Sequence, residues 1–552
     1  MFPFKWLRTH TFRNRKSGVT NSPDPPAPDQ ILNMYKGKLV TESLEYTERF
    51  ILDILGENDD FVFRHIRILA RYPATVCYLS TLTNESNLEQ EVFKPLMSAH
   101  VPHLVEQPLD KEHLKRAIPE QILYHSDLSM ETKLVRVVEA VLHGYVVVLV
   151  DGLDTAYVLK SRSVKNRSIE QPQTEQVVQG PREGFIEMLE TNLALIRYRL
   201  PTPDFRIKTM RIGKLTKSQV AVCYIEGIAN PSLVAEVMRR LSKIDIDILL
   251  DAGYLEQYIQ DHHLTPFPQI HITERPDKAV ANIAEGRVII LMDGSPFALI
   301  VPSVFSQFFH TAEDYTSRYL QGNFVRFARV VALIFSLVLP SLYVSMISFN
   351  PELIPTEFAV AVAGGRAGVP FPSVVEVLIM EVSMEVLREA TIRLPQQVGG
   401  ALSIVGVLVI GQAAVSAGFA SPITVVVIAL TTIGSFATPA YTAAFALRML
   451  RFPLIILAGI FGLYGVMVGL ILICNHLLSL KSFGVPYLTP IVPGDYEGLK
   501  DSVIRQPLWT LWKRPTFLYT RNRIRARKST DVNSEQSSVL DPGRMDGKEG
   551  EH

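Results

Sequence analysis

A helix-length segment near the middle of the chain carries charged side chains between stretches that are apolar enough to lie in a membrane. From Phe371 to Leu394 it reads FPSVVEVLIMEVSMEVLREATIRL. Ionised side chains are costly in hydrocarbon, and they are kept there mainly where they pair, face a bundle interior or line a water-filled path. The chemistry open to this segment is therefore the attraction of cations or the formation of buried ion pairs.

The spacing of these charges predicts a helix with one acidic face. Residues four apart lie on the same side of a helix, which groups three glutamates and a terminal arginine, with one more glutamate and arginine off that face. Two interpretations are open: a helix at the interface or buried in protein and held by Glu–Arg pairs, or a helix that lines a path for ions. The candidate residues are Glu376, Glu381, Glu385, Glu389, Arg388 and Arg393.

A second candidate for a pore lining is a hydroxyl-rich apolar stretch that follows later in the chain. Its hydroxyls could face a lumen or bond to their own backbone. The residues are Thr424, Thr431, Thr432, Ser435 and Thr438.

Motifs of soluble enzymes are absent from the sequence. There is no G-x-x-x-x-G-K-[ST], no G-x-G-x-x-G after a strand, no H-E-x-x-H and no G-x-S-x-G. His262 and His263 are adjacent rather than four apart, which does not suit two ligands on one helix face. We therefore predict no catalytic residues, no metal site and no cofactor, and the ligand-binding residues stay unknown at this stage.

The chain divides into regions of different composition. It has 552 residues and a formal net charge of zero, so no global charge favours nucleic acid. Residues up to Gly322 are mixed and charged, Ala328 to Leu480 are dominated by apolar residues, and polar residues return after Pro486. We predict an α+β/α architecture: a duplicated soluble α/β N-terminal domain, a polytopic α-helical membrane domain, and a disordered basic tail.

An internal duplication is predicted from two pairs of matching landmarks. TVCYLSTLTNESNLEQEV from Thr75 resembles AVCYIEGIANPSLVAEV from Ala221, and GYVVVLVDG from Gly144 resembles GRVIILMDG from Gly286. The landmarks recur in the same order at a separation of roughly 140 to 146 residues. The predicted divisions are a disordered arm at 1–30, α/β subdomains at 31–165 and 166–322, a transmembrane domain at 323–485 and a cytoplasmic tail at 486–552.

Several local features of the two copies have structural interpretations. Asp151-Gly152 and Asp293-Gly294 each stand between two apolar runs, which predicts tight hairpins rather than metal ligands. Asn84 and Asn230 stand where a helix begins and are predicted to be N-caps. Cys77 and Cys223 occupy matching strand positions and are predicted to be core residues.

The apolar half contains four stretches that are long enough to span a membrane, which takes about 20 helical residues. Basic residues before the first stretch, and the basic cluster after Lys513, both belong on the cytoplasmic side. Four crossings keep both basic regions on the cytoplasmic side but place Arg448 and Arg451 on the outer side of the membrane. Five crossings bring these two arginines to the cytoplasmic side but place the basic tail on the outer side. The stretches are Ala328–Phe349, Val398–Ala420, Pro422–Leu447 and Pro453–Leu480.

These membrane segments resemble a known family. NPELIPT from Asn350, the segment from Pro370 to Pro395, and SIVGVLVIGQAAVSAG from Ser403 are similar to the A-subunit family of spore germinant receptors. The stretch TEQVVQGPREGF from Thr174 agrees with it, and the resemblance covers roughly residues 59 to 493. The SMEVLREATIR stretch departs from the family, where an aromatic residue and a glycine are more frequent.

The resemblance implies a function that composition and spacing alone do not. Such proteins are multi-pass proteins of the spore inner membrane, with the large N-terminal domain in the cytoplasm. They work with a transporter-like B subunit and a lipoprotein C subunit, self-associate in contact with lipid, and respond to small nutrients by releasing ions. We therefore expect a membrane subunit that oligomerises into a ligand-controlled ion path. A secondary transporter and a membrane-anchored signalling scaffold remain alternatives.

Overall fold

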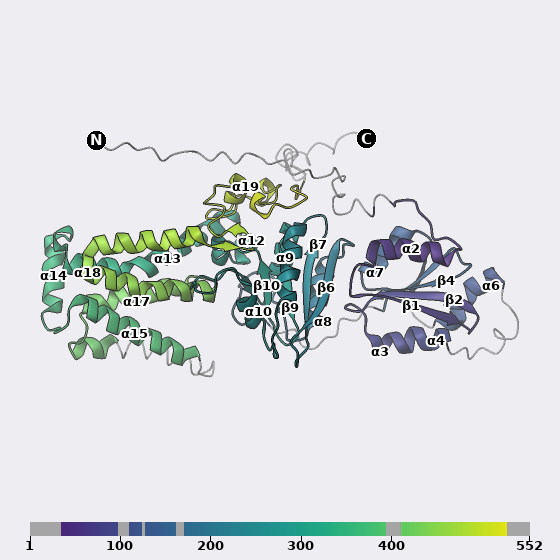
Figure 1. Ribbon diagram of the computed structural model, residues 1–552, viewed down its shortest axis with the longest axis horizontal. Coiled ribbons are helices and arrows are strands. Elements are labelled where there is room, and N and C mark those ends of the chain that lie inside the picture. The colour runs from purple at the N-terminus through teal and green to yellow at the C-terminus, as the bar shows by residue number, and fades with distance from the viewer. Residues whose placement is uncertain are drawn as a thin grey trace, which may run out of the picture.

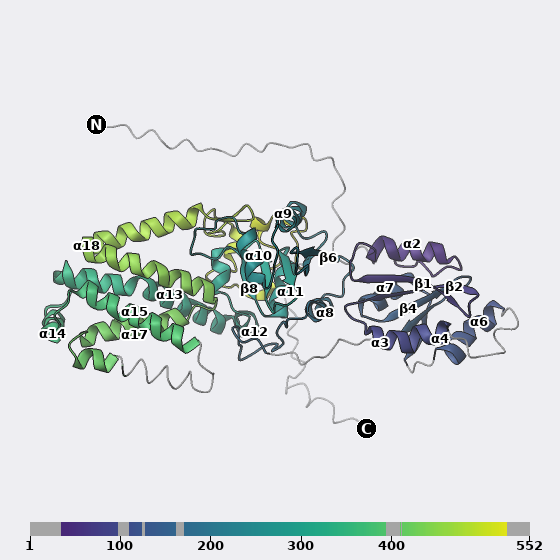
Figure 2. The same cartoon turned by 60° about the horizontal axis from the view of Figure 1, so that its bottom comes forward.

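The computed structural model describes residues 32, 35–97, 110–123, 127–161, 171–392, 409 and 411–526. Figure 1 shows three lobes in a row, namely two α/β units and a helical bundle, with a C-terminal segment lying along the middle unit. Figure 2 shows the same order of lobes after rotation. The predicted arm at 1–30, Arg393, and the part of the tail after residue 526 lie outside the described residues.

The first α/β unit is built around a five-stranded antiparallel sheet in the order β1-β2-β4-β5-β3. Strand β4 alternates its valines between two hydrophobic clusters, one on each face of the sheet, which is why the whole strand is apolar. The elements are α2 (Leu44–Leu55), β1 (Phe61–Ile68), β2 (Tyr72–Leu79), α3 (Glu85–Leu88), η1 (Glu89–Phe93), α4 (Lys94–Met97), α6 (Lys111–Ala117), η2 (Ile118–Ile122), β3 (Leu128–Glu131), α7 (Leu134–Leu142), β4 (Val146–Val150) and β5 (Ala156–Leu159).

The second α/β unit has a five-stranded sheet in the order β6-β7-β9-β10-β8, which is the order of the first sheet. Strand β9 likewise alternates between clusters on the two faces, with α8 and α11 on one side and α9 and α10 on the other. The elements are α8 (Leu189–Arg199), β6 (Phe205–Ile212), β7 (Ser218–Ile225), α9 (Pro231–Ser242), α10 (Ala252–Ile259), β8 (His271–Thr273), α11 (Pro276–Glu285), β9 (Val288–Met292) and β10 (Ala298–Val301).

The local predictions for both units are confirmed. The Asp-Gly pairs lie between the antiparallel strands β4 and β5 and between β9 and β10, and both glycines have positive φ. The side chains of Asn84 and Asn230 each accept a hydrogen bond of 3.0 Å from the backbone N–H two residues on. Cys77 and Cys223 are fully buried at matching register positions, opposite Val147 and Ile289.

A buried ion pair joins the two α/β units. Arg197 on α8 donates to both carboxylate oxygens of Asp60, at 2.7 and 3.2 Å, and to the carbonyl oxygen of Phe205 at 3.0 Å. Its side chain is fully buried. All three guanidinium nitrogens therefore have an acceptor, which satisfies the condition for stable burial of a charge.

The helical region follows the second unit through residues 302–318, in which Val304, Phe308 and Phe309 are buried. Among the described helices, α13 and α18 are long and apolar enough to cross a membrane, and α17 is a shorter apolar helix. The elements are η3 (Phe305–Phe309), α12 (Glu313–Thr316), α13 (Tyr319–Ser348), η4 (Pro351–Leu353), α14 (Thr356–Arg366), α15 (Ser373–Ile392), α17 (Pro422–Phe436) and α18 (Tyr441–Ser479).

The predicted division of the last apolar stretches is wrong. The break falls at residues 437–440 rather than near residue 450, because Pro439 disfavours a helical residue before it. Pro453 lies inside α18, whereas Gly462 has φ 60° and ψ −141° and interrupts that helix. A Cβ on Gly469 would meet Leu454, so the two arms of α18 fold back on each other as Figures 1 and 2 show.

The prediction of a disordered tail from residue 486 is also wrong for residues 486–526. This segment packs against the second unit because its few large apolar side chains find partners there: Tyr487 and Leu518 are buried, and Phe517 packs with Val304. The elements are β11 (Lys481–Ser482), β12 (Val485–Pro486), α19 (Tyr496–Leu499), η5 (Leu508–Thr510) and η6 (Thr516–Leu518).

Candidate functional site: a buried arginine–glutamate network

The charged segment singled out from the sequence forms α15, which lies against α13, α17 and α18. It begins just after Pro372, and Ser373 at its first turn is hydrogen-bonded to Ser348 at the end of α13, with the hydroxyl oxygens 2.5 Å apart. Val377, Met380 and Met384 are buried in the bundle. This packing turns part of the charged face toward the other helices.

Glu381 forms a buried ion pair between helices of the bundle. Its Oε2 accepts a hydrogen bond of 2.7 Å from Nη1 of Arg451 on α18, and Nη2 of Arg451 donates to the hydroxyl of Ser336 on α13 at 3.0 Å. Glu381 is 4% exposed and Arg451 is 2% exposed. One residue pair thus links three helices in a setting nearly closed to water, where charge is costly.

Glu385 continues the network toward the end of α15. It lies 3.3 Å from Nη1 of Arg388 on the same helix and 3.4 Å from Nε of Arg448 on α18. Arg388 also donates to the hydroxyl of Ser435 on α17 at 3.1 Å and stacks on the ring of Phe436. The guanidinium groups are therefore surrounded by aromatic and hydroxyl groups as well as by carboxylates.

Glu376 belongs to a different site near the other end of α15. Its side chain is fully buried, its Oε2 lies 3.4 Å from Nε of Arg366 on α14, and its Oε1 accepts a hydrogen bond of 2.5 Å from the backbone N–H of Ser421. It thereby fixes the turn that precedes α17. Glu389 is exposed on α15, so the structure does not bring all predicted residues into one cluster.

The network carries more positive than negative charge. It contains two glutamates, Glu381 and Glu385, and three arginines on α15 and α18. Several buried polar atoms have no hydrogen-bond partner among the described residues: Oε1 of Glu381, and Nε of Arg388, Arg448 and Arg451. A network with free donors is not a cation site in this arrangement, but it can exchange partners when helices move.

Three of the hydroxyl-bearing candidates on and after α17 bond within the chain. Thr424 lies 2.9 Å from the hydroxyl of Tyr343 and 3.0 Å from that of Ser421. Thr431 and Ser435 donate to carbonyl oxygens of their own helix, at 2.7 and 2.6 Å. Thr432 and Thr438 are buried as well, and the hydroxyl of Thr432 has no hydrogen-bond partner among the described residues.

Sequence reasoning missed the partners of the glutamates. Arg366, Arg448, Arg451 and Ser336 were not candidates, although the two arginines of α18 had already stood out as misplaced charges in the topology. An arginine in an apolar helix needs an acceptor, and that requirement could have paired them with the acidic face of α15. Among the described residues, no group of three or more His, Cys, Asp or Glu side chains is arranged to hold a metal ion.

Comparison with known proteins places the chain among spore germination proteins. A family profile described as Bacillus/Clostridium GerA spore germination protein matches residues 49–517. The chain is 40% identical over 476 residues to spore germination protein KA of Bacillus subtilis, which covers 86% of each chain. It is 39% identical over 473 residues to spore germination protein GerLA of Bacillus cereus, covering 86% of this chain and 95% of that one.

Two further matches are a membrane protein similar over most of the chain and a crystal structure similar to its N-terminal half. The chain is 38% identical over 489 residues to the uncharacterized membrane protein YfkQ of Bacillus subtilis, covering 88% and 94% of the two chains. A crystal structure of the N-terminal domain of the A subunit of the Bacillus megaterium spore germinant receptor GerK3 is 30% identical. It covers 49% of this chain and 98% of that one, with a TM-score of 0.37.

Proposed function

This chain belongs to the GerA family of spore germination proteins, and from that membership we propose that it is the A-type membrane subunit of a nutrient germinant receptor. Several copies would form an ion-conducting path that opens when the receptor meets its nutrient. The observation that carries the ion path is the incompletely satisfied Glu–Arg network across α13, α15 and α18. Charges at membrane depth are kept where they pair, face a bundle interior or line a water-filled path, and donors without a partner favour the last of these.

The mechanism we propose is a switch of ion-pair partners. In the arrangement described, the Glu381–Arg451 pair ties α15 to α18. Movement of α15 would separate this pair, and Arg448 or Arg388 would then offer donors to the released carboxylate. Because new pairs replace old ones, the closed and open arrangements can differ by little free energy, and a nutrient that favours one of them can shift the population.

We propose six passes through the membrane: α13, α15, the predicted stretch Val398–Ala420, α17 and the two arms of α18. Of Val398–Ala420, residues 398–408 and 410 lie outside the described residues, so this pass rests on the apolar sequence. Support comes from both ends of the bundle. The Ser348–Ser373 contact lies at the end remote from the soluble units, whereas His476 of the last arm is 2.8 Å from Thr265 of the second unit. Six passes keep the tail and the soluble units on the cytoplasmic side and remove the conflict over the arginines of α18.

Labelling of single cysteines tests this topology. Ala363 on α14 is exposed and lies at the remote end of the bundle, and Lys214 on the second unit lies on the opposite side. In a background with Cys474→Ser, a maleimide that cannot cross membranes should label Ala363→Cys in intact cells and Lys214→Cys only after lysis. Equal labelling of both positions would refute six passes.

The soluble half is proposed to be an internal duplication with subdomains at 31–165 and 166–322, followed by the transmembrane domain at 323–485. The shared strand order and the matching cysteine positions support this division. As partners we propose a transporter-like B subunit and a lipoprotein C subunit in the spore inner membrane, with the soluble units in the cytoplasm and with contacts between copies of this chain. The soluble pair would then couple or assemble subunits.

The decisive experiment records ion flux from liposomes that hold the chain with its partner subunits. Addition of nutrient should release ions far faster than a carrier can, and Glu381→Gln should alter that release at an unchanged protein level. Glu352→Gln is the matched control, because Glu352 is exposed in the loop after α13. Slow stoichiometric uptake of a solute would instead establish a secondary transporter, and absence of flux would favour a signalling scaffold.

A further inference from the structure

Two arginines of the helical bundle share a single carboxylate. Glu385 on α15 lies 3.3 Å from Nη1 of Arg388 on the same helix and 3.4 Å from Nε of Arg448 on α18. The neighbouring Glu381 is paired with Arg451 at 2.7 Å, so its charge is already balanced. Glu385, Arg388 and Arg448 therefore form an arginine cluster with two positive charges against one negative charge.

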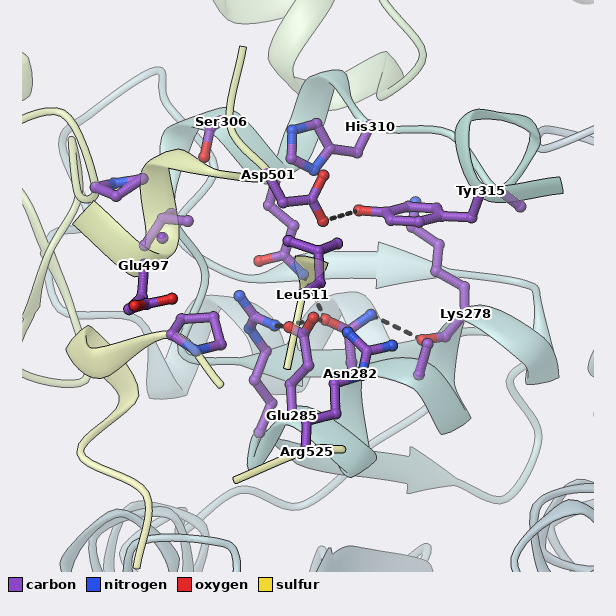
Figure 3. A pocket seen from close by; sticks show the side chains of 18 of the residues that line it. Lys278, Asn282, Glu285, Ser306, His310, Tyr315, Glu497, Asp501, Leu511 and Arg525 are labelled. Carbon is purple, nitrogen blue, oxygen red and sulfur yellow. Dashed lines mark hydrogen bonds and ion pairs between the residues drawn. The ribbon is translucent and has the colours of Figure 1, made fainter. Parts of the chain in front are cut away.

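The cavity beside the second α/β unit shows the opposite balance. Figure 3 shows this space of about 370 Å³, which is enclosed by α11, the stretch η3–α12 and residues 490–525. Its acidic and basic lining residues are equal in number, namely Asp277, Glu285, Glu497 and Asp501, and Lys278, Arg287, Lys513 and Arg525. An excess of positive charge thus distinguishes the arginine cluster from this cavity, whose lining calls for no additional anion.

The arginine cluster also holds charged donors that are buried but unused. Nε of Arg388, and Nε and Nη2 of Arg448, have no hydrogen-bond acceptor among the described residues. Arg388 spends its Nη2 on the hydroxyl of Ser435, at 3.1 Å. Glu385 keeps 36% of its side chain exposed, so the cluster reaches the outer surface of the bundle. Because buried donors without acceptors are costly, an anion that enters from this surface would stabilise the cluster.

The cluster lies beside the connection between α17 and α18. Arg388 stacks on the ring of Phe436, which is the last residue of α17, and Arg448 stacks on the ring of Tyr441, which is the first residue of α18. In the proposed six-pass topology this connection is cytoplasmic, because α17 begins beside Glu376 at the remote end of the bundle. The two guanidinium groups are then close to the headgroups of the cytoplasmic leaflet.

The side chains around the cluster suit a lipid better than water. Phe436, Tyr441, Phe445 and Val386 are all exposed on the outside of the bundle, and Phe445 lies under the guanidinium of Arg448 as well. Aromatic rings of membrane helices favour the level of the headgroups, with their apolar faces toward the acyl chains. Charged donors and apolar surface therefore occur together at one place.

We propose that the arginine cluster binds the phosphate of one anionic phospholipid. A phosphodiester carries a single negative charge, which equals the excess on the cluster. Its oxygens would accept the hydrogen bonds that Arg388 and Arg448 leave unused, and arginine matches the geometry of phosphate well. Basic sites between membrane helices on the cytoplasmic side bind anionic headgroups for this reason.

A bound phospholipid would also act on the switch of ion-pair partners. Arg388 and Arg448 are the residues that would receive the carboxylate of Glu381 when α15 moves. While a phosphate holds them, they are less available, so the lipid would favour the arrangement in which Glu381 stays paired with Arg451. This consequence rests on the proposed function, whereas the binding of the lipid requires only that the helices lie in the membrane as proposed.

Quenching by brominated lipids measures the binding. Met449 is exposed beside Arg448, so Met449→Trp places a reporter there in a chain whose own tryptophans, Trp6, Trp509 and Trp512, are replaced by phenylalanine. Full-length protein is reconstituted in phosphatidylcholine that contains a small fraction of phosphatidylglycerol, and bromine is carried by the acyl chains of one lipid at a time. Brominated diacylglycerol, which lacks the phosphate, is the neutral control.

Phosphatidylglycerol should be preferred over phosphatidylcholine about tenfold, and Arg388→Gln and Arg448→Gln should each remove most of that preference. Arg448→Lys keeps the charge and should retain part of the preference, which separates loss of binding from loss of the fold. Arg318→Gln is the matched control, because it removes an exposed basic residue just before α13 and should leave the preference unchanged.

Four outcomes would overturn the proposal. Equal quenching by the two phospholipids, or by diacylglycerol, would show that the cluster does not select a phosphate. Absence of quenching by any lipid would show that protein covers this surface. A loss in Arg318→Gln as large as in Arg448→Gln would assign the preference to general surface charge, and displacement by inorganic phosphate would assign the site to a soluble anion. Since no ion flux is measured, this test and that of the proposed ion path can fail independently.

Discussion

Arg197 and Arg451 each bind a carboxylate at 2.7 Å in an almost water-free setting, the first between the two α/β units and the second between helices α15 and α18. Every guanidinium nitrogen of Arg197 has an acceptor, and Asp60 accepts an additional hydrogen bond from Thr81. Nε of Arg451 has no partner in the described chain, and neither has Oε1 of its partner Glu381.

This difference distinguishes a permanent ion pair, Asp60–Arg197, from one that can exchange partners, Glu381–Arg451. A buried pair with every polar atom satisfied has no alternative partner, so breaking it leaves a charge without compensation. A pair with free donors and acceptors beside further arginines has other arrangements of similar free energy within reach. We therefore infer that the two α/β units keep a fixed position relative to each other, and that the helices joined by Glu381 and Arg451 can move relative to each other.

The largest effect is expected at the joint between the soluble units. Asp60→Ala should lower the free energy of unfolding by about 3–5 kcal/mol, because Arg197 stays buried without its counter-charge. Circular dichroism of the full chain during urea unfolding measures it, and Asp53→Ala, an exposed position on α2, is the control. A loss below about 1 kcal/mol would show that this pair is also free to find other partners.

A third buried arginine, Arg326, makes the stability of the fold depend on pH through its neighbour His310. His310 is neutral when folded because burial and the Arg326 charge lower its pKa to about 4, whereas an unfolded histidine titrates near 6.5. Between these values the unfolded chain binds a proton that the folded chain does not, so stability falls as pH drops from 6.5 to 4. The loss is at most about 3.4 kcal/mol.

Replacement of the imidazole tests this linkage. His310→Gln should remove that pH dependence, and the exposed His263→Gln should retain it. The measurement is the unfolding midpoint of the parent and of both variants between pH 4 and 8. If His310→Gln follows the parent at every pH, the folded chain does not lower the pKa of His310 through burial and the Arg326 charge.

Features that depend on neighbouring residues were predictable from the sequence. β-Branched runs predicted strands β4 and β9, and a polar residue before an apolar period predicted the N-caps at Asn84 and Asn230. In the membrane half, apolarity and the acidic face of α15 were likewise visible. These signals are local, because they reflect the periodicity and hydrogen bonding of single elements.

Features that depend on distant residues were not predictable. The partner of Glu381 is 70 residues away, and no local period encodes that contact. Gly462 stands inside the stretch Pro453–Leu480, which was predicted to cross the membrane, yet its positive φ reverses the chain. The tail looked disordered because it is basic and rich in proline, but Tyr487 and Leu518 find apolar partners on the second unit. Tertiary packing decided each of these cases.

A smaller effect is expected for the exchangeable pair. Glu381→Gln should cost about 2 kcal/mol, because the hydroxyl of Ser336 still accepts a hydrogen bond from Arg451. The rate of nutrient-induced ion release should change at the same time. Thermal unfolding in detergent and flux from liposomes measure the two quantities. A cost as large as that of Asp60→Ala would remove the distinction between the two pairs.

The smallest change in stability is expected when both members of the membrane pair become apolar. Glu381→Met combined with Arg451→Met should leave the free energy of unfolding within about 1 kcal/mol of the parent, because well-packed apolar residues often replace a buried ion pair without loss. Ion release should nevertheless fail to respond to nutrient, since no carboxylate remains to change partners. Normal release from this stable double variant would mean that the pair only packs the bundle, and that the ions pass elsewhere.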